Sequence, residues 1–219
     1  MAAKQGNLFV ISGPAGAGKS MIVKRLIEKH PDMGVSVSCT TRAPRPTEVD
    51  GVNYYFVSDA EFDRLVAEDG FYEWAHVHEN RYGTPKATVQ RELEAGRDLI
   101  LEIDVQGCLQ AMRKNPAVTG IFVSPPSREN LEKRLRDRGT ETEHSIAVRL
   151  NNVAGEVAQA YSYHYTIIHQ DWNEVPDALE KAVDEVYAII TAKRLETNKR
   201  LDFLNHLAAS LKEGFEELE

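Results

Sequence analysis

A glycine-rich segment near the start of the chain carries its clearest chemical signal. It reads Gly13-Pro14-Ala15-Gly16-Ala17-Gly18-Lys19-Ser20, and its spacing matches the G-x-x-x-x-G-K-[ST] pattern of a phosphate-binding loop. In that pattern backbone N–H groups surround phosphate oxygens, the lysine reaches the β- and γ-phosphates, and the hydroxyl binds Mg²⁺. We therefore predict that the segment binds a nucleoside triphosphate, with Lys19 on the phosphates and Ser20 on the metal.

The segments on either side of this loop support the prediction. Residues 8–12 form an apolar run that is typical of a short buried strand, and residues 19–29 have helical spacing. A helix that begins at the loop would add positive partial charge where the phosphates lie. The alternative is a glycine-rich turn that matches by chance, which the flanking strand and helix make a weak explanation.

A second basic loop follows the strand expected near residue 36. Arg42 and Arg45 lie three residues apart on a segment that contains two prolines. Paired guanidiniums bind phosphate through bidentate hydrogen bonds. For this segment alone, a solvated basic turn is an equally good interpretation.

Aromatic residues surround a carboxylate further along the chain. Glu73 lies between Tyr72 and Trp74, and a carboxylate in an apolar wall needs a partner. Guanine offers two adjacent N–H donors on one edge, whereas adenine presents an acceptor there. Tyr54 and Tyr82 carry hydroxyls that can bind a phosphate while their rings line a pocket. Taken alone, Glu73 is also compatible with an ordinary surface position.

Two further clusters fit phosphoryl chemistry. The strand expected at 98–103 and the next residue, Asp104, end in acids after the apolar run 99–101, and a carboxylate at a strand end organises Mg²⁺ and its water in nucleotide-binding proteins. Arg134, Arg138 and Arg149 flank a glycine, which suits a mobile lid that closes over the transferred group. A polar strand end and a solvated helix with ion pairs are the alternatives.

Strand-like and helix-like segments alternate, which is typical of an α/β fold with a mainly parallel sheet. Strands are expected near residues 8–12, 34–38, 53–58, 71–77, 98–103, 119–124 and 164–169. Helices are expected near residues 19–29, 59–68, 85–95, 105–113, 127–137, 143–160 and 175–194. Apolar positions at Leu201, Leu204, Leu207 and Leu211 predict one more amphipathic helix.

The amino-acid composition limits the kinds of protein that this chain can be. The 219 residues are 42% hydrophobic and 27% charged, as in an ordinary globular domain. The net charge of −8 argues against broad binding to nucleic acid or anionic membranes. No apolar run is long enough to span a membrane, and the first residues do not read as a secretory signal. Cys39 and Cys108 are not spaced as a metal-binding pair, and the histidines are not spaced as zinc ligands. We expect a cytoplasmic protein.

Taken together, these motifs resemble the guanylate kinase family over roughly residues 7–192. The resemblance rests on the segments 13–20, 36–45, 51–54, 73–75, 82–84, 102–107 and 138–143, which occur in the family's order. It implies a P-loop NTPase fold with a central parallel sheet, an inserted GMP-binding region of short strands and an arginine-rich lid. The implied regions are a core of about 7–35, 95–135 and 160–192, a GMP-binding region of about 36–90, a lid of about 136–158 and a C-terminal helical extension at 195–219.

The resemblance also implies an activity and residue roles. The activity is Mg²⁺-dependent phosphorylation of GMP, and of dGMP, by ATP in guanine nucleotide metabolism. GMP would be held by Ser38, Arg42, Arg45, Tyr54, Glu73, Tyr82, Thr84 and Asp104. The phosphoryl group would be surrounded by Lys19, Arg42, Arg134, Arg138 and Arg149, with Ser20 on Mg²⁺ and Asp104 reaching it through water. Glu102 stands where the family often has Asp, and His169 and Gln170 depart from its usual pattern.

Three other functions fit part of these motifs. A non-catalytic interaction module of the same fold typically loses the loop chemistry, whereas Lys19, Ser20 and Asp104 are present. A kinase that acts on another phosphorylated acceptor, such as a sugar, would leave Ser38 and Glu73 unexplained. A P-loop GTPase or ATPase switch would leave the second basic loop unexplained. We expect no nucleic-acid or membrane partner, and a homo-oligomer through the C-terminal helix.

Overall fold

The computed structural model describes residues 5–77, 79–137, 142–171 and 173–216. Its central sheet has five parallel strands in the order β2-β7-β1-β8-β9. These strands are β1 (Leu8–Ser12), β2 (Gly34–Val35), β7 (Leu99–Glu102), β8 (Thr119–Ser124) and β9 (Tyr165–Ile168). The predicted α/β fold with a parallel sheet is thereby confirmed.

Strand β1 lies at the middle of this sheet and is buried on both faces. Phe9 and Ile11 contact the core formed with helices α1 (Lys19–Lys29) and α7 (Ala178–Arg194). Leu8 and Val10 point the other way, toward α3 (Lys86–Glu94) and α4 (Val105–Lys114). Successive side chains of a strand alternate between its two faces. Because both faces of β1 pack against helices, the side chains on both must be apolar, and this explains the continuous apolar run in the sequence.

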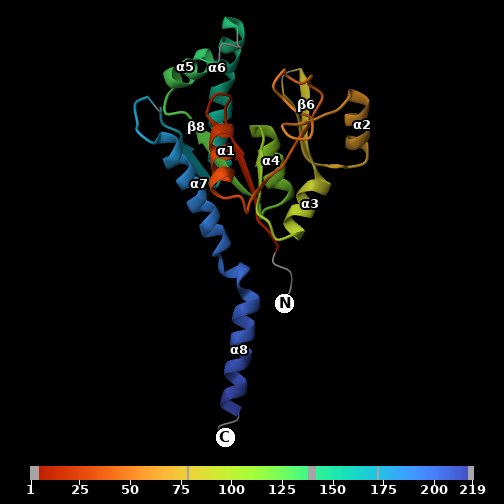
Figure 1. The fold of residues 1–219 in the computed structure, drawn as a ribbon, viewed down its shortest axis with the longest axis vertical. Coiled ribbons are helices and arrows are strands. Elements are labelled where there is room, and N and C mark those ends of the chain that lie inside the picture. Colours follow the sequence, from red (N-terminus) through yellow and green to blue (C-terminus); the bar gives the residue numbers. More distant parts are fainter. Residues whose placement is uncertain (1–4, 78, 138–141, 172, 217–219) are drawn as a thin grey trace.

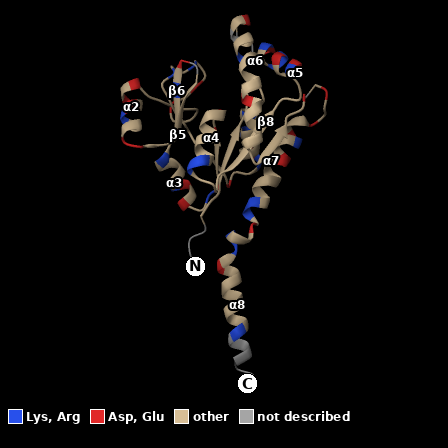
Figure 2. Ribbon diagram, turned by 180° about the vertical axis from the view of Figure 1, so that it is seen from behind, with Lys and Arg blue, Asp and Glu red and all other residues tan. Residues whose placement is uncertain are grey.

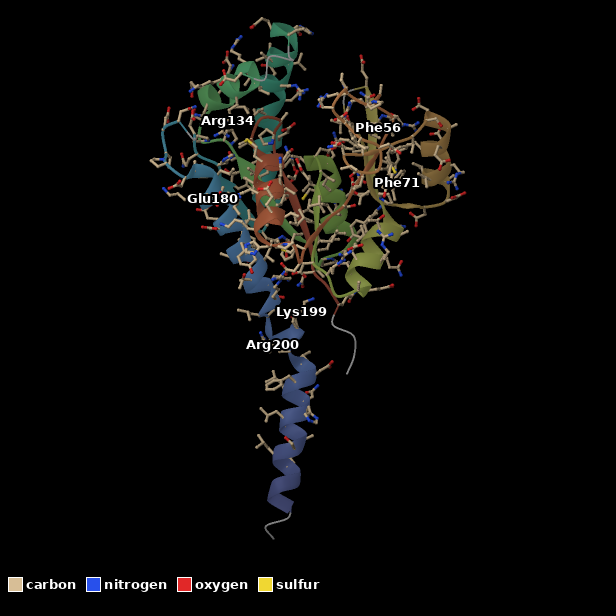
Figure 3. The ribbon with its side chains drawn as sticks, in the orientation of Figure 1. Phe56, Phe71, Arg134, Glu180, Lys199 and Arg200 are labelled. Carbon is tan, nitrogen blue, oxygen red and sulfur yellow. The ribbon has the colours of Figure 1, made fainter. Side chains whose placement is uncertain are left out.

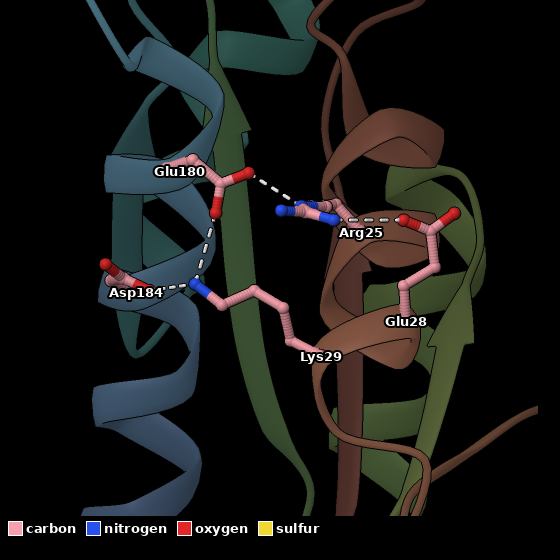
Figure 4. Close-up of polar contacts among 5 residues, drawn as sticks. All are labelled: Arg25, Glu28, Lys29, Glu180 and Asp184. Carbon is pink, nitrogen blue, oxygen red and sulfur yellow. Dashed lines mark hydrogen bonds and ion pairs between the residues drawn. The ribbon is translucent and has the colours of Figure 1, made fainter.

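Helices α1 and α7 are also joined by surface ion pairs (Figure 4). Glu180 accepts from Arg25 Nε at 2.6 Å and from Lys29 Nζ at 3.2 Å, and Asp184 accepts from Lys29 at 2.7 Å. Glu28 lies 3.4 Å from Arg25. Ion pairs between exposed side chains contribute little to stability, so the apolar core holds the two helices together.

A second, four-stranded sheet lies apart from the first, in the order β4-β3-β6-β5 (Figure 1). Its strands are β3 (Cys39–Thr40), β4 (Tyr55–Phe56), β5 (Phe71–Val77) and β6 (Asn80–Pro85), and α2 (Asp59–Ala67) packs on it. Arg81 on β6 donates to the Asp59 carboxylate at 2.6 Å and to Asp63 at 2.5 Å. Strand β6 was absent from our sequence prediction, and the strands expected at 34–38 and 53–58 are only two residues long.

Two helices form the upper end of the molecule in Figure 1, opposite the second sheet. Helix α5 (Arg128–Asp137) and helix α6 (Glu143–Ala158) pack through Leu131, Leu135 and Ile146. A single 3₁₀ turn, η1 (Gln159–Ser162), leads from α6 toward β9. Helix α7 begins at residue 178 instead of the expected 175, because Asp177 adopts a left-handed conformation with φ 58°.

The chain ends in helix α8 (Leu201–Glu216), which follows the short 3₁₀ turn η2 (Thr197–Lys199). Figures 1 and 2 show α8 extending away from the rest of the molecule. The predicted helix at the leucine-rich segment is confirmed. Within the ranges that the structure describes, no helix is both long and apolar enough to cross a membrane.

Candidate active site

A cavity of about 580 Å³ lies where the parallel strands end and the second sheet begins. The carboxyl ends of β1 and β7 contribute to it, which is the usual ligand position in open α/β sheets. Most sequence-predicted site residues line this cavity. They are Gly13, Ala15, Gly16, Gly18, Lys19, Ser20, Ser38, Arg45, Tyr54, Glu73, Tyr82, Asp104 and Arg149.

Two glycines of the glycine-rich loop have positive φ and leave no room for a side chain. Gly13 has φ +138°, and a Cβ there would lie 2.2 Å from the Val123 carbonyl oxygen. Gly18 has φ +96°, and its Cβ would lie 2.2 Å from His169 Nδ1. Both positions therefore require glycine. Ala17 of this loop is fully buried.

Lys19 and Ser20 lie at the loop end that opens helix α1. The Lys19 ammonium donates to the Gly13 carbonyl at 2.7 Å and to the Pro14 carbonyl at 3.0 Å. The Ser20 hydroxyl donates to the carboxylate of Glu102, the last residue of β7. A cation and a hydroxyl–carboxylate pair thus lie side by side on the cavity wall.

Asp104 ends the loop after β7 and caps helix α4. Its Oδ1 accepts from the Gly107 backbone N–H at 2.8 Å, which satisfies a donor that the first turn leaves unpaired. Burial raises the pKa of Asp104, while its cavity exposure leaves an oxygen face open to a ligand. The predicted strand-end acid is therefore also the residue that starts a helix.

Glu73 is a buried carboxylate, 3% exposed, on strand β5. The Thr84 hydroxyl donates to its Oε1 at 2.6 Å, and Ser38 Oγ lies 3.4 Å from that hydroxyl. Burial raises the pKa of Glu73 to about 7, and the nearby Asp104 charge adds to the rise. Thr84 is fully buried and supports Glu73 from behind without lining the cavity.

Helix α4 approaches Glu73 closely on its other side. A Cβ on Gly107 would lie 2.3 Å from Glu73 Oε2, so any larger residue at this helix position would displace the carboxylate. The carboxylate is thereby fixed between Thr84 and the first turn of α4. It lies on the cavity wall.

Arg42 forms an ion pair at the edge of the second sheet. One terminal guanidinium nitrogen donates to both oxygens of Glu48, at 2.7 and 2.8 Å, and the other donates to the Ala43 carbonyl at 2.7 Å. Its guanidinium carbon lies 5.7 Å from the centre of the Tyr54 ring. Arg42 is not among the residues that line the cavity.

Glu48 also holds the neighbouring Arg45 segment. Its Oε2 accepts from the Arg45 backbone N–H at 2.8 Å, and its side chain is only 12% exposed. Sequence reasoning missed Glu48, although an acid three residues after the second of two paired arginines is a recognisable ion-pair signal.

Arg134 lies on helix α5, where Figure 3 labels it, and is not among the residues that line the cavity. Its guanidinium donates to three backbone carbonyls: Ala17 at 3.2 Å, His169 at 2.9 Å and Gln170 at 2.9 Å. Burial lowers the pKa of Arg134. The arginine thus joins helix α5 to the loop and to the segment after β9. Arg138, the next predicted arginine, lies outside the described residues.

Seven further residues line the cavity that were absent from our list of predicted site residues. They are Val77, Glu102, Ile103, Val105, Asn152, Val153 and Glu156. Three of them share helix α6 with Arg149, at positions 152, 153 and 156. Spacings of three and four residues mark one helix face, so this set could have been found from the arginine once the helix was predicted.

The donor set suits a magnesium ion. Mg²⁺ prefers oxygen ligands and is usually bound by one or two carboxylates together with substrate phosphates and water. The Ser20 hydroxyl, Glu102 and Asp104 supply such oxygens around the cavity. In the part of the chain that the structure describes, no cluster of three or more His, Cys, Asp or Glu side chains could hold a metal by itself.

A phosphate-binding loop on a parallel sheet faces a second sheet that carries arginines, tyrosines and a buried acid across one cavity. This arrangement defines a P-loop protein of the nucleoside-monophosphate kinase class. A family model described as guanylate kinase matches residues 5–190. The chain belongs to the guanylate kinase family.

Individual relatives agree with this assignment. A guanylate kinase from Caldanaerobacter subterraneus subsp. tengcongensis is 46% identical over 199 residues, which is 91% of this chain and 93% of the relative. One from Pseudoalteromonas translucida is 43% identical, covering 89% of this chain and 91% of the relative. The crystal structure of guanylate kinase from Anaplasma phagocytophilum superimposes with a TM-score of 0.71 at 32% identity and covers 89% of each chain.

Proposed function

We propose that this chain transfers a phosphoryl group from ATP to GMP, giving ADP and GDP, and that it also accepts dGMP. The observation that supports this most is the buried Glu73 carboxylate, which lines the same cavity as Lys19 of the phosphate-binding loop. One site for phosphates and one selective site for a base within a single cavity suit transfer between two nucleotides. We place the reaction in guanine nucleotide metabolism in the cytoplasm.

The base of GMP is read by Ser38, Glu73, Thr84 and Asp104. Ionised Glu73 accepts from guanine N1–H and from the exocyclic amino group, and Thr84 holds the carboxylate in place at 2.6 Å. Adenine would direct an acceptor at the same oxygens and leave a buried carboxylate unpaired. Sites built to hydrogen-bond their ligand reject analogues that lack the group by roughly 10⁴–10⁵-fold.

The phosphate of GMP is bound by Arg42, Arg45, Tyr54 and Tyr82. Arg45, Tyr54 and Tyr82 line the cavity, and Arg42 lies behind them, fixed by Glu48. Burial raises the pKa of Tyr54, so this tyrosine keeps its proton and donates it in a hydrogen bond to the phosphate.

The triphosphate of ATP is bound by residues 13–20, with the Lys19 ammonium moving from the loop carbonyls onto the phosphates. Ser20 would hold Mg²⁺, and Asp104 would hold it through water. The ion would offset negative charge on the phosphates. Arg149 on α6 and Arg138 add positive charge around the transferred group, and Arg134 carries its charge beneath the loop.

This reaction requires positioning and charge compensation more than proton transfer. The GMP phosphate is already a nucleophile at neutral pH, so no general base is needed. The chain's contribution is to hold two anions in line within one cavity, which can supply roughly 7–11 kcal/mol of the barrier, and to offset negative charge with fixed cations. We also propose that residues 195–219 join copies of the chain into a homo-oligomer.

The first experiment measures ADP release from MgATP with GMP, dGMP, AMP, CMP, UMP or no acceptor. ADP release with GMP and dGMP alone supports the proposal. No release with any acceptor, from folded protein that still binds GMP, would favour the interaction-module alternative.

A Lys19→Ala variant tests the assignment of the loop. We expect turnover to fall by at least about a hundredfold, because a charge at the transferred phosphoryl group is removed, while GMP affinity stays near wild type. Lys24→Ala, at an exposed position on the same helix, is the matched control. Wild-type turnover in a folded Lys19→Ala protein would contradict the assigned role.

A further inference from the structure

His169 is a buried histidine that lies against the phosphate-binding loop, and the proposed reaction gives it no role. It follows strand β9 and is 0% exposed. Its Nδ1 lies 2.9 Å from the carbonyl oxygen of Ala17, and a Cβ on Gly18 would lie 2.2 Å from the same nitrogen. The imidazole therefore contacts two consecutive residues of the loop, immediately before Lys19.

The contact between His169 and Ala17 is a hydrogen bond from the ring to the backbone. Burial lowers the pKa of His169 from its ordinary value of 6.5, so the ring is neutral at pH 7 and carries one N–H. A carbonyl oxygen only accepts hydrogen bonds, so this hydrogen lies on Nδ1. Ala17 is fully buried as well, and water therefore cannot take the place of the ring as a donor.

The backbone around His169 fixes the position of the ring. Its N–H donates to the carbonyl of Ser124, the last residue of β8, at 2.9 Å. Its own carbonyl accepts from Arg134 at 2.9 Å, and Arg134 also donates to the Ala17 carbonyl at 3.2 Å. The Ala17 oxygen thus accepts from a ring at the end of one strand and from a guanidinium on a helix, and groups on such elements hold a geometry more precisely than groups on loops.

Holding the Ala17 carbonyl also orients the N–H of Gly18, because both groups belong to one peptide unit. That peptide bond is trans, and in a planar trans peptide the C=O and the N–H point in opposite directions. The carbonyl faces His169 and Arg134, which are not among the residues that line the cavity, whereas Gly18 is. The Gly18 N–H is therefore directed toward the cavity, where the loop pattern places phosphate oxygens.

We propose that His169 is a positioning residue of the phosphate-binding loop: it holds the Ala17–Gly18 peptide so that the Gly18 N–H donates to a phosphate oxygen of ATP. The ring acts through the backbone of the loop and not through contact with the substrate. This inference rests on the proposed binding of ATP to residues 13–20. It adds that a side chain 152 positions away in the sequence supports that binding.

Two amide substitutions separate the hydrogen bond from the space that the ring fills. Asn carries its amide nitrogen on the γ carbon, as His carries Nδ1, whereas Gln carries it one carbon further out. By titration calorimetry we expect His169→Asn to bind MgATP within about twofold of the wild type, and His169→Gln and His169→Leu to bind it about five- to tenfold more weakly, the effect of one lost hydrogen bond. Equal Kd values for the Asn and Gln variants would overturn the proposal.

The choice of ligand distinguishes support of the loop from other effects of the substitution. Magnesium tripolyphosphate has the charged part of ATP without its base and sugar. For His169→Gln we expect the Kd of tripolyphosphate to rise by the same factor as the Kd of MgATP, while the Kd of GMP stays at the wild-type value. A loss for MgATP alone would mean that His169 acts on the adenosine part, and an equal loss for GMP would mean a general structural defect. Either result would overturn the proposal.

His164, at the other end of β9, provides the matched control. Its Nδ1 accepts from the Gly120 backbone N–H at 3.0 Å, and it is not among the residues that line the cavity. His164→Leu should keep the wild-type Kd for MgATP and for tripolyphosphate; a loss as large as that of His169→Gln would contradict a specific role for His169. A wild-type protein that binds neither ligand would refute the proposed ATP site and this inference with it, whereas wild-type binding that His169→Gln leaves unchanged would refute this inference alone.

Discussion

Replacing Glu73 with glutamine should stabilise the protein and impair its proposed function. Burial raises the pKa of Glu73 to about 7, against 4.5 for an ordinary glutamate. The folded state therefore binds more protons than the unfolded state between these two values, and the free energy of unfolding falls as pH rises through that window. Glutamine keeps the acceptor for Thr84 but has no charge to bury.

The size of the effect follows from the separation of the two pKa values. Each pKa unit corresponds to about 1.4 kcal/mol, so ionisation of Glu73 costs the folded state about 3 kcal/mol at pH 8. The Gln variant should be more stable than the wild type by up to that amount at pH 8 and nearly equal to it at pH 4.5. Its affinity for GMP should fall, because an amide directs donors at the donors of guanine.

Urea unfolding followed by circular dichroism at half-unit steps from pH 4.5 to pH 8.5 measures this. Asp104, whose pKa burial also raises, keeps some pH dependence in both proteins, so the comparison is between slopes. Glu94→Gln, which alters an exposed carboxylate on α3, is the control and should follow the wild type. If Glu73→Gln shows the wild-type slope, the carboxylate is not buried as described and the reasoning fails.

Three further substitutions probe the supports of the site. Gly18→Ala should lower the free energy of unfolding by at least about 2 kcal/mol and abolish ATP binding, because a Cβ would lie 2.2 Å from a histidine nitrogen. Gly155→Ala is the control, because open space surrounds that position, and it should change neither stability nor ATP binding. Urea unfolding measures the stability and titration with ATP measures the binding. Glu48→Ala should raise KM for GMP about ten- to a hundredfold, because Arg42 loses its ion-pair partner, and should leave KM for ATP unchanged. Glu48→Gln should give a KM for GMP between those of the wild type and Glu48→Ala. Equal changes in both KM values would contradict this. Arg134→Ala should cost on the order of 3 kcal/mol by leaving three carbonyls without a donor, whereas Arg134→Met with wild-type stability would show that those bonds contribute nothing.

The central sheet could be predicted because its strands are buried on both faces. Residues 8–11 and 121–123 are continuously apolar, and the strands at 8–12 and 119–124 were placed correctly to the residue. Strand β6 contains Asn80, Arg81 and Gly83, and it is held by pairing with β5 instead of by an apolar pattern. A strand whose stability comes from its partner leaves little periodicity in its own sequence, so single-sequence reasoning missed it.

The residues of the site likewise differ in how far the sequence alone predicts them. Loop residues 13–20 follow a motif with glycines at positions of positive φ, and that local pattern is visible in the sequence. The position of Arg134 depends on carbonyls contributed by residues 17, 169 and 170, which only the folded chain brings together. The roles of the individual residues toward GMP and ATP stay predictions until the variants are measured.

The packing of α1 against α7 has a consequence for how the protein is made. The two helices join residues that are 155 positions apart, as in the Arg25–Glu180 pair. At 5–20 residues per second, about 8–30 s of synthesis separate the two partners. During that time the apolar residues of α1 and of one face of β1 have no α7 to cover them. The nascent chain is therefore open to chaperones and to aggregation until nearly all of it has been translated, and a message that ends before residue 178 yields a phosphate-binding loop without a folded core beneath it.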